Sequence, residues 1–323
     1  MRASSVGLGL AVISAATFGT AGTFGSALID AGWTPGAAVI ARIGIAALLL
    51  TVPALFALRG NWNLLRRRLP TVVAFGLLAV VAAQLCFFNA VAHLSVGVAL
   101  LIEYSGTLLV VLWLWLRHGQ RPRRLTVVGG MLALGGMALV LDLTGEQHVD
   151  LVGVLWGLGA AVGLATYFMS SARTDEPLPP VVTAWAGMAV GAAALGVLAV
   201  CGVLPFRVDT AATRLAGHQT SWVVPVAGLS LVAAVIAYTT GIGATRRLGA
   251  RLASFVGLAE VLFAVLIAWL LLGERPGVLQ GIGGVIVLGG IALVRADDRQ
   301  PAVDPDARPA TPLARADTPT AQV

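Results

Sequence analysis

Ten apolar stretches, each about as long as a membrane-spanning helix, dominate this sequence. A bilayer core about 30 Å thick needs about 20 residues of α-helix to cross it. Only 11% of the residues are charged, against about 25% in an average soluble domain. We therefore predict an all-α integral membrane protein with ten transmembrane helices, at 6–28, 35–57, 70–91, 95–116, 125–143, 151–171, 179–203, 222–243, 248–272 and 277–294.

The arginines are unevenly distributed among the loops that join these stretches. All 21 basic residues are arginine, and membrane proteins concentrate such residues in cytoplasmic loops. If the N-terminus is cytoplasmic, only Arg207, Arg214 and Arg275 fall on the opposite side. The cytoplasmic side then holds Arg2, Arg59, Arg66, Arg67, Arg68, Arg117, Arg121, Arg123, Arg124, Arg173, Arg246, Arg247, Arg251, Arg295 and Arg299. We predict that both termini are cytoplasmic.

The overall composition points to a bacterial source. Lysine is absent from a chain rich in Ala, Gly and Arg, which is typical of a GC-rich bacterial genome. We therefore expect a multi-pass protein of a bacterial inner membrane. The final segment, 296–323, differs from the rest, because residues 297–323 contain five prolines, eight charges and no aromatic residue. Such a segment cannot bury enough apolar surface to fold, and we predict a disordered cytoplasmic tail.

The chain contains an internal repeat. Residues 94–140 align without a gap with residues 248–294, at an offset of 154 positions. A repeat of five spans has an odd number of membrane crossings, so its second copy must enter the membrane upside down. We predict two inverted five-helix repeats, 1–145 and 146–295, an architecture typical of secondary transporters. Identical pairs include Trp115/Trp269, Gly119/Gly273, Arg121/Arg275, Pro122/Pro276, Gly129/Gly283, Gly130/Gly284, Gly135/Gly289 and Gly136/Gly290.

Charge differences between the two copies support the inversion independently. Loop 117–124 reads Arg-His-Gly-Gln-Arg-Pro-Arg-Arg, whereas its equivalent 271–278 reads Leu-Leu-Gly-Glu-Arg-Pro-Gly-Val. Three arginines are thus missing where the second copy would face outward, as the positive-inside rule requires. The glycine pairs of the fifth and tenth spans lack ionisable neighbours in mid-span, and small residues let helices approach closely. We predict that these two spans serve packing.

At this level of detail the chain resembles a known family. The doubled Leu-Gly-Glu-Arg-Pro, Gly-Gly and Leu-Gly-Gly pattern and the five-plus-five layout are similar to the EamA branch of the drug/metabolite transporter superfamily. Residues 41–50 look like that family's arginine-containing second span, and 97–106 look similar to threonine/homoserine-type exporters. The resemblance covers about 6–295 and implies a ten-helix carrier whose fifth and tenth spans lie outside the cavity. One departure is Gln120, where a glutamate would mirror Glu274.

Three ionisable residues lie within predicted spans: Arg42, Glu103 and Glu260. Placing each of these side chains inside the membrane costs about 2.5–3.5 kcal/mol on insertion scales, so we expect each to have a functional or structural role. Under the offset of 154, the two glutamates lie three positions apart, which places them on the same face of equivalent helices. We expect that face to look toward a central cavity, where a carboxylate binds a substrate amine or exchanges a proton. The alternative is a structural ion pair with Arg42 or Arg251.

Other polar residues within spans extend this candidate site. Arg42 has two open roles, to bind a substrate carboxylate through its bidentate guanidinium or to neutralise Glu103. Tyr104 follows Glu103 and is a candidate for the cavity wall. The remaining candidates, each with hydrogen bonding between helices as its alternative role, are Asn89, Gln84, Tyr167 and Tyr238.

The sequence predicts a secondary transporter, an exporter of small polar metabolites such as amino acids that works by alternating access around a midplane cavity. Coupling to protons and uncoupled facilitation both remain open. The alternative substrates are multidrug, quaternary-ammonium or aromatic compounds. A channel would favour a continuous polar stripe, and an intramembrane enzyme would need a His-Glu-x-x-His or Gly-x-Ser-x-Gly motif, which the sequence lacks.

The expected partners are a small-molecule substrate, the lipid bilayer and, if transport is coupled, protons. The absence of lysine excludes a P-loop site and a pyridoxal-phosphate Schiff base. We predict no enzymatic activity, no cofactor and no metal. We also predict no nucleic-acid binding, because the arginines cluster in loops between apolar segments.

Overall fold

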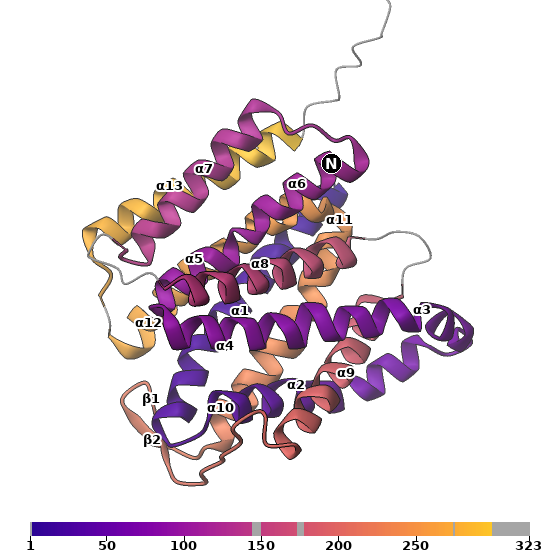
Figure 1. The fold of residues 1–323 in the computed structure, drawn as a ribbon, viewed down its shortest axis with the longest axis vertical. Helices are drawn as coiled ribbons and strands as arrows, with labels where there is room; N and C mark the ends of the chain where they lie inside the picture. Colours follow the sequence, from indigo (N-terminus) through magenta and orange to yellow (C-terminus); the bar gives the residue numbers. More distant parts are fainter. Residues whose placement is uncertain (1, 144–149, 173–177, 274, 299–323) are drawn as a thin grey trace, which may run out of the picture.

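The computed structural model describes residues 2–143, 150–172, 178–273 and 275–298, and it is almost entirely helical (Figure 1). Ten helical spans are present, as predicted. In chain order the elements are α1 (Arg2–Asp30), α2 (Pro35–Ala57), α3 (Trp62–Ala74), η1 (Phe75–Ala82), α4 (Ala83–His93), α5 (Val96–Tyr104), α6 (Gly106–His118), α7 (Arg124–Val140), α8 (Leu151–Ser171), α9 (Pro180–Val200), α10 (Val223–Ala227), η2 (Gly228–Ile236), α11 (Ala237–Gly257), α12 (Ala259–Leu272) and α13 (Val278–Asp298).

The third and eighth spans are composite helices. The third runs through α3, η1 and α4, and the eighth through α10, η2 and the first part of α11, with a π-helix in the middle of each. Gly249 has φ 79° and ψ 163° inside α11, a backbone conformation that only glycine adopts without strain. The ninth span therefore begins after Gly249 and continues through α12, in agreement with the predicted stretch 248–272.

The internal repeat is wider in the structure than in the sequence. The π-helix η1 spans residues 75–82, and η2 spans 228–236, so the two nearly coincide at the same offset of 154. The fourth span breaks between α5 and α6, and the ninth breaks at the equivalent point, between α11 and α12. Gly119 and Gly273 end equivalent helices with nearly the same left-handed conformation. The equivalence therefore reaches back at least to Phe75.

Helices α7 and α13 show directly that the two copies are inverted. A Cβ atom at Gly129 would lie 2.7 Å from the carbonyl oxygen of Gly290, and one at Gly136 would lie 2.7 Å from that of Gly283. Gly283 is the equivalent of Gly129, and Gly290 is the equivalent of Gly136. Such reciprocal contacts define a two-fold interface, here between antiparallel helices. The predicted inversion is confirmed. The predicted packing role is confirmed for these four glycines, whereas a Cβ atom at Gly135 or Gly289 would meet no atom within 4 Å.

The remaining helices exchange partners between the halves. Helix α1 packs against α11 and α12, while α8 packs against α4, α5 and α6. Likewise α2 packs against η2 and α9, and α9 packs against η1. The first span of each half thus packs against the fourth span of the other half.

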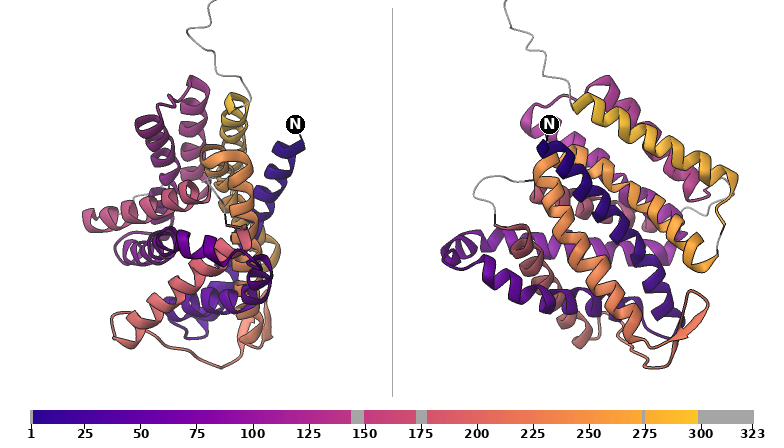
Figure 2. Two further views of the ribbon diagram at one scale, coloured as in Figure 1. Left: turned by 90° about the vertical axis from the view of Figure 1, so that its right-hand side faces the viewer. Right: turned by 180° about the vertical axis from the view of Figure 1, so that it is seen from behind.

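Both termini of the described chain lie at one end of the molecule, as an even number of spans requires (Figure 2). Near this end α1 contacts the turn of α11, since a Cβ atom at Gly7 would lie 3.0 Å from Cβ of Arg247. Helix α13 continues to Asp298, three residues into the segment predicted as a tail, because the last two residues find partners. The rest of that segment, residues 299–323, lies outside the described residues.

The opposite end carries a feature that the sequence analysis did not predict. Two short antiparallel strands, β1 (Thr213–Leu215) and β2 (His218–Thr220), form a hairpin between α9 and α10. The indole nitrogen of Trp33 donates a hydrogen bond to the carbonyl of Asp209, at 2.5 Å. This link ties the segment before the hairpin to the connection between α1 and α2.

Candidate functional site

Six of the eight predicted site residues gather in the core. We call this group the acid–aromatic cluster; it comprises Arg42 of α2, Glu103 and Tyr104 of α5, Tyr167 of α8, Tyr238 of α11 and Glu260 of α12. The three tyrosines are buried, whereas Arg42 and both glutamates are partly accessible. Five helices from both repeats therefore contribute to one site.

The broken spans place the two glutamates. Glu103 lies one residue before the end of α5, and Glu260 is the second residue of α12. Each therefore lies at the break of its span, near the middle of the 23-residue stretch Val96–His118 or of its equivalent. Broken helices expose polar backbone groups at such points, where transporters commonly build binding sites.

The two carboxylates lie close enough to interact electrostatically, and neither has an arginine in ion-pair contact among the described residues. The phenol of Tyr104 donates a hydrogen bond to Glu260. Arg42 interacts with Glu260 through space without forming an ion pair. Two acids from different repeats therefore lie within electrostatic range of each other.

Arg42 has taken other partners. Its Nη2 atom donates to the carbonyl oxygen of Ala233 at 2.5 Å, and its guanidinium carbon lies 5.7 Å from the ring centroid of Phe18. Ala233 belongs to the π-helix η2, whose wide turns alter the regular hydrogen-bond ladder. The Nε atom of Arg42 is buried and has no hydrogen-bond partner among the described residues.

The predicted alternative, a structural ion pair for the glutamates, is therefore not what the structure shows. Arg42 bonds the η2 backbone instead. Arg251 pairs with Asp298 at 2.8 Å, at the end of the molecule that carries the termini.

A continuous row of rings runs beside the acids. We call Phe18, Tyr238, Tyr167 and Phe75 the aromatic row; consecutive ring centroids lie 5.0, 5.7 and 5.9 Å apart. These distances suit edge-to-face and tilted stacking. The hydroxyl of Tyr167 is buried without a hydrogen-bond partner among the described residues. It lies so close to Gly241 that a Cβ atom there would be 2.5 Å away.

Two predicted residues lie apart from the cluster. Asn89 is exposed and donates to the carbonyl of Leu85 on its own helix, at 2.7 Å. Gln84 is half-buried on α4, and within the described chain it has no hydrogen bond to the cluster. Conversely, Phe18 and Phe75 belong to the aromatic row although neither was predicted from the sequence. A phenylalanine in an apolar span carries no signal of its own, so only the packing of helices could reveal these two.

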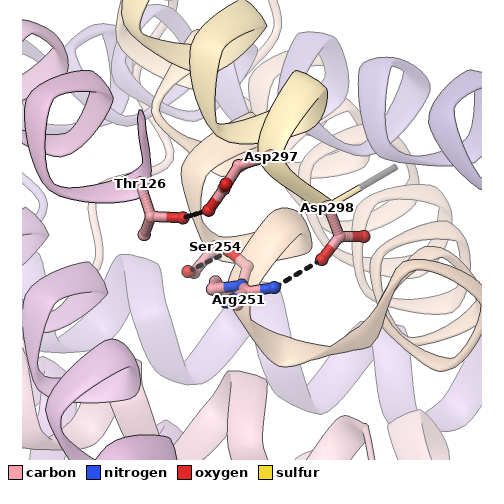
Figure 3. Close-up of polar contacts among 5 residues, drawn as sticks. All are labelled: Thr126, Arg251, Ser254, Asp297 and Asp298. Atoms are coloured by element: carbon pink, nitrogen blue, oxygen red, sulfur yellow. Dashed lines mark hydrogen bonds and ion pairs between the residues drawn. The ribbon is translucent and has the colours of Figure 1, made fainter. Parts of the chain in front are cut away.

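A second polar group lies at the end that carries the termini (Figure 3). Thr126 of α7 donates to the buried carboxylate of Asp297 on α13. Beside it Arg251 pairs with Asp298, and Ser254 donates to the carbonyl of Arg251 at 2.8 Å. These contacts join α7 and α13 to the start of the ninth span. They stabilise the packing of these helices, and the Oδ1 atom of Asp297 is left without a hydrogen-bond partner among the described residues.

No group of three or more His, Cys, Asp or Glu side chains with metal-binding geometry occurs among the described residues. The chemistry available at the cluster is therefore that of carboxylates, phenols, aromatic faces and one guanidinium. Such groups bind, orient and exchange protons.

Comparison with known proteins gives a consistent result. The model of the EamA-like transporter family matches residues 5–142 and 151–296, one match in each half. The chain is 26% identical over 224 residues to the Bacillus subtilis (strain 168) protein named uncharacterized transporter YwfM, covering 67% of this chain and 70% of that protein. A crystal structure with a TM-score of 0.74 and 22% identity covers 91% of this chain and 98% of the solved one, which supports the fold alone.

These matches agree with eight helices long and apolar enough to cross a membrane, together with two shorter apolar helices. The protein is a multi-pass membrane transporter and not an enzyme. The chain belongs to the EamA-like transporter family.

Proposed function

We propose that this protein is a secondary transporter that exports small amine-bearing metabolites, with amino acids as the first class to test. The observation that carries the proposal is the meeting of Glu103 and Glu260, from equivalent broken spans, without an ion-pair partner among the described residues. A carboxylate in the middle of a membrane span has a high free-energy cost and usually marks a substrate or ion pathway. A protonated amine, or a proton, supplies the missing partner.

The inverted repeats support alternating access. Two halves of similar structure and opposite orientation permit two states of similar energy, each open to a different side. The breaks at residues 105 and 258 and the π-helices η1 and η2 provide places for equivalent spans to bend, since π-helical segments are frequent at functional sites. In this mechanism the acid–aromatic cluster stays fixed while access to it changes.

Exchange of a proton for the substrate provides a coupling route. If one carboxyl group carries a proton when the site is empty and releases it when an amine binds, the two ions cross in opposite directions. Exchange of one proton for one monovalent ammonium moves no net charge across the membrane, so the pH gradient rather than the membrane potential would drive it. Uptake into vesicles that accelerates with an imposed pH gradient favours coupling, and a rate independent of the gradient favours uncoupled facilitation.

The arginine pattern supports an orientation and a location for the protein. The loops at the end that carries the termini hold most of the arginines, including Arg247 and Arg251. By the positive-inside rule this end faces the cytoplasm, and we place the protein in a bacterial inner membrane.

Counterflow in proteoliposomes tests the proposal. Labelled solute should exchange against an excess of unlabelled amino acid or amine inside vesicles that contain the protein. Glu103→Gln and Glu260→Gln should each reduce this exchange at least about tenfold, because an amide cannot pair with an ammonium group. Asp30→Asn is the matched control, since Asp30 is an exposed acid at the end of α1. Full exchange by both glutamine variants contradicts the proposal.

A further inference from the structure

From the contacts around the two acids we infer that the acid–aromatic cluster prefers monocationic amines with an apolar, aromatic body over zwitterionic amino acids. This inference rests on the proposed function and narrows its substrate class. Three independent features of the described residues carry it: the charge balance, the aromatic row and the engagement of Arg42.

The charge balance favours a guest with one positive charge. Two carboxylates and one guanidinium carry a formal charge of −1 when all three are ionised. Unpaired charge away from water is costly, and no cation lies in ion-pair contact with Glu103 or Glu260 among the described residues. A monocation or a proton restores neutrality, whereas a zwitterion adds no net charge.

The aromatic row suits an organic cation rather than a small hydrated one. Ring faces attract cations, and this attraction grows as the site loses water. Phe18, Tyr238 and Tyr167 stack in sequence beside the acids, and Tyr238 and Tyr167 interact electrostatically with Glu260. Tyr238, Tyr167 and Phe75 are buried, whereas Phe18 is partly accessible. An amine whose ammonium group lies near the carboxylates would therefore place its apolar body against the accessible part of Phe18. The unpartnered Tyr167 hydroxyl adds one polar contact.

Arg42 is poorly placed to bind a substrate carboxylate. One face of its guanidinium lies over Phe18, its Nη2 atom already donates to Ala233, and its Nε atom is buried. A carboxylate that sought the bidentate geometry of arginine would have to displace the η2 carbonyl. The same carboxylate would approach Glu103 and Glu260, which repel it.

Matched pairs of ligands test the inference. We would measure competition by unlabelled ligands in the counterflow assay, with L-phenylalanine against phenethylamine and L-leucine against isopentylamine. Each amine is its amino acid without the carboxylate. Each amine should inhibit counterflow at a concentration about tenfold or more below that of its parent amino acid. Phenethylamine should inhibit at a lower concentration than isopentylamine.

Variants of one ring separate the aromatic contribution. Tyr238→Leu should weaken competition by phenethylamine about fivefold. The control Tyr238→Phe keeps the ring and should keep the preference for phenethylamine over L-phenylalanine. Arg42→Gln should leave the order of amine over amino acid unchanged. If the amino acids compete as well as the amines or better, and Arg42→Gln abolishes their competition, the inferred preference is wrong but the proposed function still stands. Absence of exchange with all four ligands contradicts both.

Discussion

At the scale of single residues, the acidic side chains within the helices differ in the contacts that their carboxylates make. Asp297 is only 3% exposed; its Oδ2 atom accepts a hydrogen bond from Thr126, while its Oδ1 atom has no partner among the described residues. Through this bond it joins α13 to α7. The carboxylates of Glu103 and Glu260 repel each other, and Glu260 accepts a hydrogen bond from the phenol of Tyr104. We therefore expect Asp297 to have a structural role and the two glutamates to have a functional one.

The Thr126–Asp297 pair offers a prediction about stability. Thr126→Val should lower the free energy of unfolding by about 1–3 kcal/mol, because it leaves a buried carboxylate without its donor. Adding Asp297→Leu to that variant should restore much of the loss, since replacing both partners with apolar groups is nearly neutral. Thermal unfolding of purified protein in detergent measures both variants. A Thr126→Val protein as stable as wild type contradicts the expected role.

At the scale of elements, α7 and α13 form the clearest structural joint. Their backbones meet at Gly129 with Gly290 and at Gly136 with Gly283, and no side chain fits between them. At the end that carries the termini, Arg251 and Asp297 reinforce the joint, whereas their equivalents by the offset are Gly97 and Leu143. The two ends of the molecule are thus held differently. Charged groups make the contacts at one end, whereas at the other Leu143 lies against Gly97 and Gln280 donates a hydrogen bond to the carbonyl of Val140, at 3.1 Å.

Neighbouring glycines of α7 test this packing. Gly136→Leu should destabilise the protein by about 1–3 kcal/mol, because the new side chain meets the backbone of α13 and the helices must separate. Gly135→Leu is the matched control; a Cβ atom at Gly135 finds no atom within 4 Å, so its effect should stay within about 0.5 kcal/mol. Unfolding temperatures measured in the same detergent compare the two. Equal destabilisation by both substitutions would show that α7 and α13 do not pack in this way.

At the scale of the whole molecule, the fold is far more predictable from the sequence than the site. Span length and the offset of 154 predict the ten helices and the inversion, because apolar length and repeated glycines are written directly in the chain. The cost of ionisable groups in mid-span identifies Glu103, Glu260 and Arg42. It does not identify the partner of Arg42, because Ala233 offers a backbone carbonyl from a π-helix. Nor does it identify Phe18, whose role depends on how α1 packs against the other repeat.

Opposite insertion of the two halves underlies every step from the repeat to the paired acids. Its most direct test is cysteine labelling at the equivalent, exposed positions Arg121 and Arg275, in a Cys86→Ser/Cys201→Ser background. An impermeant maleimide added to intact cells should label Arg275→Cys at once and Arg121→Cys only after the membrane is permeabilised. Labelling of both cysteines from the same side would contradict the inverted architecture and, with it, a central site shared by Glu103 and Glu260.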